Sequence, residues 1–67
     1  MLIKIKDTII NTNNIVYATI LLDSLQVELS TGTKVYIKSN ERLVKDRIKE
    51  CQQWLDLIIE TQGKNEQ

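Results

Sequence analysis

The chain has 67 residues, of which nine are basic and nine are acidic, so its formal net charge at pH 7 is zero. This length corresponds to one domain near the lower limit of independent folding, where a second copy of the chain is a natural stabiliser. The balanced charge excludes the large positive field typical of nucleic-acid-binding proteins, and the absence of histidine removes the commonest side chain for titration near pH 7 and for metal binding.

The composition also indicates where the protein works. Its single cysteine, Cys51, cannot form an intrachain disulfide, which favours a reducing compartment. Lys4 and Lys6 interrupt the N-terminal segment where a signal peptide needs an unbroken apolar core, and no run approaches the ~20 apolar residues of a membrane span. We therefore expect a cytoplasmic protein that is not embedded in a membrane.

The first third of the chain predicts short strands separated by turns. Leu2–Lys6 alternates apolar and polar residues, and Asp7-Thr8 is typical of a tight turn before a brief return strand at Ile9-Ile10. The polar run Asn11–Asn14 favours a corner or a single helical turn. The segment Ile15–Leu22 is almost entirely apolar and rich in β-branched residues, so we expect it to be a central strand covered on both faces.

The middle of the chain predicts a hairpin. After a turn at Asp23-Ser24, the segment Leu25–Leu29 alternates cleanly, with its leucines and valine facing inward. Gly32 supplies the positive φ that a hairpin connection requires, and Lys34–Lys38 alternates again.

One long amphipathic helix is predicted from Asn40 to Gln62, capped by Ser39 or Asn40 and ended by Gly63. Its apolar residues recur at steps of three and four and share one stripe, formed by Val44, Ile48, Cys51, Leu55, Ile58 and Ile59. The expected fold is α+β, an antiparallel meander of four to five short strands followed by the long C-terminal helix packed on the sheet. Residues 1–63 form this single domain, and residues 64–67 form a frayed polar tail.

The length of the helix predicts a surface for self-association. About 22 helical residues span about 33 Å, whereas a strand of six or seven residues spans about 20 Å, so we expect the C-terminal half of the helix to overrun the sheet. That half is also the more apolar one, which predicts a homodimer interface, or one with another protein partner, formed by Trp54, Leu55, Leu57, Ile58 and Ile59. In the alternative interpretation, a curved sheet or the N-terminal strand buries these residues within the monomer.

A second candidate surface is basic and aromatic. If the alternation holds, one sheet face carries Lys4, Lys6, Lys34, Tyr36 and Lys38, with Tyr17 nearby. Lysines around a stacking aromatic residue are one way in which small β-domains bind single-stranded nucleic acid. Lysine is equally the ordinary residue of a solvated or edge strand, and the zero net charge favours that interpretation.

The remaining polar residues predict no catalytic, metal or cofactor site. Cys51 lies within the apolar stripe and is interpreted as a small buried residue with an unreactive thiol. The acidic residues of the helix alternate with lysine and arginine, as on a solvated face, and these acids are Asp46, Glu50, Asp56 and Glu60. We therefore expect a protein that is not an enzyme. A cavity for an apolar ligand between helix and sheet has no sequence mark of its own.

The strand pattern resembles a known family. It looks like the skeleton of the small flagellar FlbD/SwrD family, and the segments that carry the likeness, followed by a helix, are Ile10-Asn11, Ile15–Tyr17, Asp23-Ser24, Val27–Leu29, Thr31-Gly32 and Val35–Lys38. A more distant likeness is to the β-rich LytTR DNA-binding domain. The predicted helix is longer than the tail of FlbD-like proteins, and the basic loops of LytTR domains are absent. No functional residue carries over from either likeness.

Overall fold

The computed structural model describes residues 1–65, and it describes side chains as far as residue 62. Residues 1–65 fold into five strands, a short 3-10 turn and one helix, in the order β1 (Leu2–Ile5), β2 (Thr8–Asn11), η1 (Thr12–Asn14), β3 (Ile15–Ile20), β4 (Ser24–Leu29), β5 (Lys34–Lys38) and α1 (Val44–Asn65). The pairs β1–β2, β3–β4 and β4–β5 are all antiparallel. The predicted α+β fold with a C-terminal helix is therefore confirmed.

The strands form two sheets, not the single meander that we expected. β1 and β2 make a separate hairpin, and β3, β4 and β5 make a three-stranded sheet in that order. The break falls at η1, where the side-chain oxygen of Asn11 accepts a hydrogen bond of 3.1 Å from the main-chain N–H of Asn13 and starts a turn. The predicted corner at 11–14 is thus confirmed, and its consequence is that the first hairpin leaves the plane of the second sheet.

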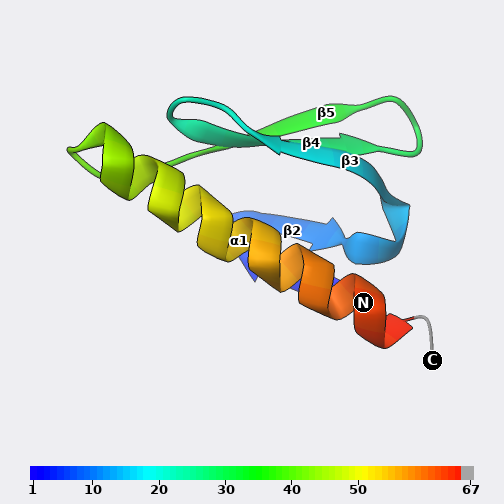
Figure 1. Cartoon of the computed structure of the whole chain (residues 1–67). Helices are drawn as coiled ribbons and strands as arrows, with labels where there is room; N and C mark the ends of the chain where they lie inside the picture. The colour runs from blue at the N-terminus through cyan, green and yellow to red at the C-terminus, as the bar shows by residue number, and fades with distance from the viewer. Residues whose placement is uncertain (66–67) are drawn as a thin grey trace.

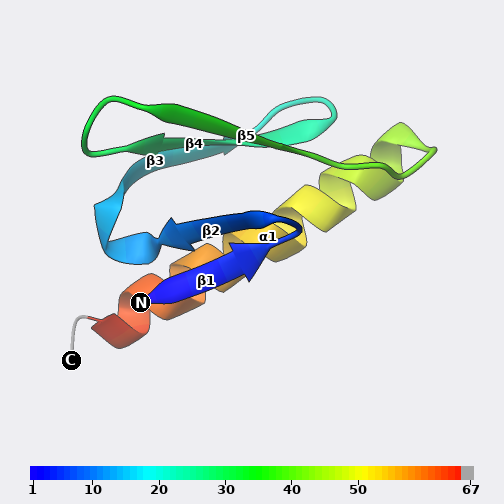
Figure 2. The same ribbon diagram turned by 180° about the vertical axis from the view of Figure 1, so that it is seen from behind.

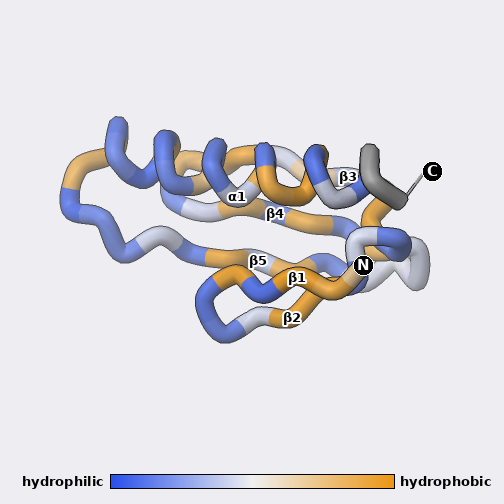
Figure 3. Tube along the Cα trace, turned by 90° about the horizontal axis from the view of Figure 1, so that it is seen from below, coloured by the Kyte–Doolittle hydropathy of each residue, from blue (hydrophilic) through white to orange (hydrophobic). Residues whose placement is uncertain are grey.

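The molecule has two layers (Figures 1 and 2). The three-stranded sheet is one layer, and the β1–β2 hairpin and α1 together form the other. Seen from the side of the second layer, α1 runs along the β3 edge of the sheet and the hairpin lies toward β5 (Figure 3). The side chains buried between the layers come from both, namely Ile3, Ile5, Ile10, Leu25, Val27, Ile37, Cys51 and Ile58.

β3 is an edge strand, so the expectation of a central strand at Ile15–Leu22 is wrong. β4 occupies the centre of the sheet, and β3 ends at Ile20. Val16 is the extra residue of a β-bulge between Ile15 and Tyr17, and the side chains of Val16 and Tyr17 are 62% and 54% exposed. A continuous apolar run is typical of a strand covered on both faces, but here the bulge turns part of that run toward solvent.

The two hairpin turns differ in how well the sequence predicts them. Gly32 has a φ of +89°, as expected for the β4–β5 connection. In the first hairpin Ile5 pairs with Thr8, so the turn is Lys6-Asp7 and lies one residue earlier than predicted. Lys6 takes a φ of +54°, a conformation that residues other than glycine seldom adopt.

The helix begins at Val44, four residues later than predicted, because side chains hold the preceding loop in a non-helical conformation. The hydroxyl of Ser39 accepts a hydrogen bond of 3.3 Å from the N–H of Glu41. The guanidinium of Arg47 donates to the carbonyl oxygen of Glu41 at 2.6 Å and to that of Arg42 at 3.2 Å. These bonds occupy groups that an earlier start would use within the helix.

The helix also ends later than expected, at Asn65, so Gly63 does not end it. The sequence places no proline near this end to force a stop, and a glycine inside a helix costs only about 1 kcal/mol relative to alanine. Residues 64 and 65 of the predicted polar tail thus belong to α1, and residues 66–67 lie outside the described residues.

Candidate interaction surface

The C-terminal half of α1 is covered within the monomer, so the expected overhang at this end is wrong. Ile58 is 2% exposed and Thr61 is 5% exposed. The side-chain amide of Gln62 donates to the carbonyl oxygen of Thr12 at 3.1 Å and reaches that of Ile15 at 3.4 Å. The estimate from strand length failed because the hairpin and η1 lie outside the three-stranded sheet and extend the surface under the helix.

The five residues predicted for the interface occupy three different environments. Ile58 belongs to the core, and Trp54 and Leu55 are half-buried against it. Leu57 and Ile59 are exposed, at 37% and 58%. Residues two positions apart in a helix point about 200° away from each other. Leu57 and Ile59 therefore lie on opposite flanks of α1 and cannot belong to one small contact. Each of the two interpretations of the sequence therefore holds for some of these residues. Some side chains are buried within the monomer, and others are left in solvent.

One flank of α1 carries apolar residues from Val44 to Ile59. Val44 and Ile48 are each 42% exposed, and together with Leu55 and Ile59 they occupy a sector of about 60° beside the buried stripe. We call Val44, Ile48, Leu55 and Ile59 the apolar flank of α1. An apolar strip of this kind on a small protein is typical of a surface that another molecule covers.

The apolar flank borders the edge strand β3. Between them lies a groove of about 180 Å³, lined by residues 15–18 and by Leu55, Ile58, Ile59 and Gln62. Pockets for small molecules usually enclose about 300–1,000 Å³, so this groove is small for a ligand of that kind. It is of a size to take one or two apolar side chains from a neighbouring chain.

β3 also offers unpaired main-chain groups at its free edge. Leu21 donates to the carbonyl of Ser24, and alternation along an antiparallel pair then directs the groups of Thr19 toward β4 and those of Ala18 and Ile20 away from it. Within residues 1–65, β3 pairs only with β4. Gln62 covers only the carbonyl of Ile15 at the start of the strand.

The composition of β3 is unusual for an edge. β3 contains no charged residue, whereas the other edge of this sheet, β5, carries Lys34 and Lys38. Charged side chains, lysine above all, discourage pairing between the edges of sheets. The sheet is therefore protected at β5 and, apart from the bulge at Val16, unprotected at β3.

The basic and aromatic residues are divided between the two sheets. Lys34, Tyr36 and Lys38 lie on the outer face of the three-stranded sheet, where the register adds Tyr17 and also Glu28, which pairs with both Tyr17 and Lys34. Lys4 lies in β1 of the hairpin, and Lys6 lies in the turn between β1 and β2. The Nζ of Lys6 donates a hydrogen bond of 2.8 Å to the carbonyl oxygen of Lys38. The expected single face with all five residues is thus wrong. The part that exists combines two tyrosines and two lysines with one acid.

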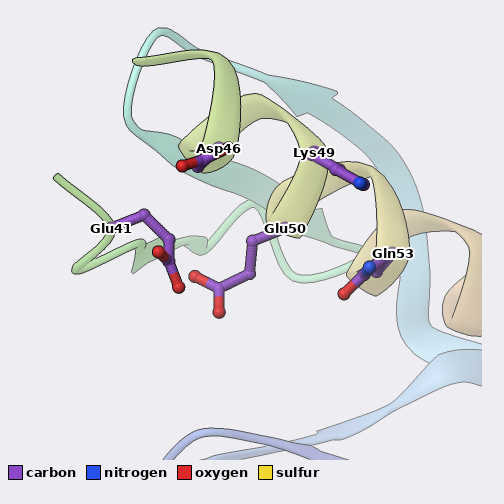
Figure 4. Close-up of a pocket in the computed structure, with 5 residues that line it drawn as sticks. All are labelled: Glu41, Asp46, Lys49, Glu50 and Gln53. Atoms are coloured by element: carbon purple, nitrogen blue, oxygen red, sulfur yellow. The ribbon is translucent and has the colours of Figure 1, made fainter. Parts of the chain in front are cut away.

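Three acidic residues, Glu41, Asp46 and Glu50, line a shallow hollow at the N-terminal end of α1 (Figure 4). Glu41 and Glu50 point toward the same space from the loop and from the helix, and Lys49 points away from them. Glu50 accepts a hydrogen bond of 2.6 Å from the hydroxyl of Ser39. Among the described residues, no three side chains of histidine, cysteine, aspartate or glutamate are grouped to hold a metal ion.

Cys51 is fully buried, as predicted. Burial in the core, with smaller effects from the negative charges of Glu50 and Asp23, raises the pKa of its thiol above the usual 9.0. The thiol is therefore neutral at physiological pH and shielded from reagents.

Sequence reasoning missed three residues of this surface. Val44 and Ile48 belong to the predicted apolar stripe that packs on the sheet, and Val16 belongs to the segment predicted as a covered central strand. The helical period alone places a residue on a stripe but does not tell how much of the stripe the sheet covers. A signal for β3 was present, since a strand without charged residues is open to pairing on either side.

Comparisons with known proteins identify no related protein. No family model matches the sequence, and the curated proteins and the solved structures contain no significant match. The resemblance to the FlbD/SwrD family therefore stays a prediction. In the described part of the chain, no helix is both long and apolar enough to span a membrane.

Proposed function

We propose that this chain is a non-enzymatic interaction module, without a cofactor, that self-associates as a homodimer through the apolar flank of α1. The observation that carries the proposal is the position of this flank. Ile48 and Ile59 are 42% and 58% exposed and lie on the side of α1 that faces the uncharged edge strand β3. Burying them and closing the groove against a second copy would remove apolar surface from water. Each Å² of apolar surface buried in this way stabilises the dimer by about 25 cal/mol.

The small size of the domain supports the same proposal. A 67-residue chain retains only a few kcal/mol of stability once chain entropy is counted, and association adds stability by mass action. The buried and unreactive thiol of Cys51 is compatible with work in a reducing compartment, and we place the protein in the cytoplasm on that ground.

Light scattering on the chain at concentrations from micromolar to millimolar tests the proposal. We expect a dimer whose proportion rises with concentration, and we expect Ile59→Lys to shift it to monomer by at least tenfold in dissociation constant. Ile9→Lys is the matched control, because Ile9 is 67% exposed on the outer face of the β1–β2 hairpin, away from α1. A monomer throughout, or a dimer that is lost with Ile9→Lys but kept with Ile59→Lys, would refute the proposal.

A second candidate function is the binding of single-stranded nucleic acid on the outer face of the three-stranded sheet. It is favoured by Tyr17 and Tyr36, which are 54% and 58% exposed on one face together with Lys34 and Lys38. The acid Glu28 between them and the zero net charge of the chain weigh against it. Titration with a fluorescent oligonucleotide at two salt concentrations tests it, since binding must weaken with salt and with Tyr36→Ala.

A further inference from the structure

We infer that the second copy joins at the edge of β3, so that two three-stranded sheets form one continuous six-stranded antiparallel sheet with both copies of α1 on the same face. This inference rests on the proposed self-association and specifies how it occurs. It combines the two open features of the same side of the molecule, the unpaired main chain of β3 and the apolar flank of α1.

The open groups of β3 define the register. The N–H and C=O groups of Ala18 and Ile20 point away from β4, while the bulge at Val16 and the bond from Gln62 to Ile15 obstruct the start of the edge. A two-fold axis through Thr19 pairs Ala18 of each copy with Ile20 of the other and satisfies all of these groups. Within β3, which ends at Ile20, no other two-fold register pairs both residues without involving the bulge.

The helices fit the same axis. Ala18 and Leu55 line the same groove, so the centre of the contact falls near the middle of the span from Ile48 to Ile59. A two-fold axis across the sheet sets the two copies of α1 antiparallel, and Ile48 of each copy then faces Ile59 of the other. The two residues are eleven positions apart, or about 16 Å along the helix, which leaves room for Leu55 and its counterpart between them.

The charges beside the apolar flank also match an antiparallel copy. Lys49 and Asp56 lie within about 20° of each other around the helix, about 60–80° beyond Ile59 on the solvent side of the flank, with the base in the N-terminal half and the acid in the C-terminal half. Antiparallel helices place each base opposite an acid of the other copy. Parallel helices would place like charges together, which costs association energy.

The outline of this side of the molecule is comparable with a standard protein interface. The molecule measures 37 by 23 by 19 Å, so a whole side that contains the long axis covers roughly 700–850 Å², which is the upper limit for the contact. A standard protein interface takes about 800 Å² from each partner. A strand from a different protein would form hydrogen bonds with the edge of β3, but it would not cover the apolar flank of α1 or pair with the charges of the helix. For this reason we assign the site to a second copy.

Cross-linking at the axis tests this arrangement. In a non-hydrogen-bonded antiparallel pair the two Cβ atoms lie about 4.5–5.5 Å apart, close to the separation that a disulfide spans. We expect the Thr19→Cys variant to form a disulfide dimer under mild oxidation, at least tenfold faster than the wild type. Gln26→Cys is the matched control, because Gln26 pairs with Thr19 on the same face but would lie about 14 Å from its counterpart.

Amide hydrogen exchange on the wild type supplies a second readout that needs no variant. We expect the amides of Ala18 and Ile20 to exchange at least tenfold more slowly at millimolar than at micromolar concentration. A dimer in light scattering without this protection, or equal cross-linking of Thr19→Cys and Gln26→Cys, overturns the β3 pairing and leaves the proposed function standing. A monomer at every concentration overturns both, and slower exchange only after a foreign strand peptide is added overturns the assignment to a second copy.

Discussion

Gln62, near the end of α1, donates a side-chain hydrogen bond to the carbonyl oxygen of Thr12, fifty residues earlier in the chain, with an Nε2–O distance of 3.1 Å. This bond ties the last element to the 3-10 turn that separates the two sheets. Thr12 itself is fully buried, and its carbonyl oxygen also accepts a hydrogen bond from the N–H of Ile15. The bond from Gln62 therefore fixes the C-terminal half of the helix against η1, where strand length alone had suggested an overhang.

Replacing Gln62 with alanine should lower the free energy of unfolding by about 0.5–1.5 kcal/mol, because the carbonyl oxygen of Thr12 loses one of its donors and keeps the N–H of Ile15. Urea unfolding followed by the fluorescence of Trp54 measures the change. The control is Gln53→Ala, an exposed residue of the same helix, for which we expect a change within about 0.5 kcal/mol. Equal effects of the two variants would show that the bond adds no stability.

Lys6→Gly should stabilise the protein by about 0.5–1 kcal/mol. Lys6 has a φ of +54° at the first position of the two-residue β1–β2 turn, where a glycine avoids the strain of the left-handed conformation. The gain is reduced by the lost bond from Lys6 to the carbonyl of Lys38 and by the greater freedom of glycine in the unfolded chain. Thermal unfolding measures it, and Lys4→Gly within β1 must destabilise by a similar amount. A loss of stability with Lys6→Gly would contradict the turn geometry.

The elements with a regular period were predictable from the sequence. Leu25 and Val27 alternate with polar residues and are fully buried, and Gly32 stands where the second hairpin needs a positive φ. Cys51 shares the helical stripe with Ile58, and both are in the core. In each case the local pattern and the tertiary environment agree, so the pattern alone was sufficient.

The structure differs from the sequence predictions where the environment of a residue depends on distant parts of the chain. An apolar run such as Ile15–Leu22 looks the same in a central strand and in an edge strand bordered by a helix. The late start of α1 depends on Arg47 reaching back to carbonyls that precede the helix. For the candidate surface, the sequence indicated Leu55 and Ile59, but the exposure of Ile48 depends on how far the sheet extends beneath the helix.

Ser39→Ala should destabilise the fold by about 1–2 kcal/mol. Ser39 is 2% exposed, donates to a carboxylate oxygen of Glu50 at 2.6 Å and accepts from the N–H of Glu41. The alanine removes a charge-assisted bond and leaves a main-chain donor without its partner. Urea unfolding measures the loss, with Ser30→Ala on an exposed loop as the control. If Ser30→Ala lowers stability as much as Ser39→Ala does, the loop before α1 is not held in this way.

Cys51 should make the stability of the fold depend on alkaline pH. Burial raises the pKa of its thiol above the usual 9.0, with smaller contributions from the charges of Glu50 and Asp23. The unfolded chain then loses the thiol proton at a lower pH than the folded chain. The contribution of Cys51 is therefore complete below the unfolded-state pKa and is lost as the pH rises from there through the folded-state pKa, by at most about 1.4 kcal/mol per pH unit. Urea unfolding at pH 7 and pH 10 measures this loss, which must be smaller in Cys51→Ala. Equal losses in both proteins would mean that the thiol ionises as readily in the folded chain as in the unfolded one.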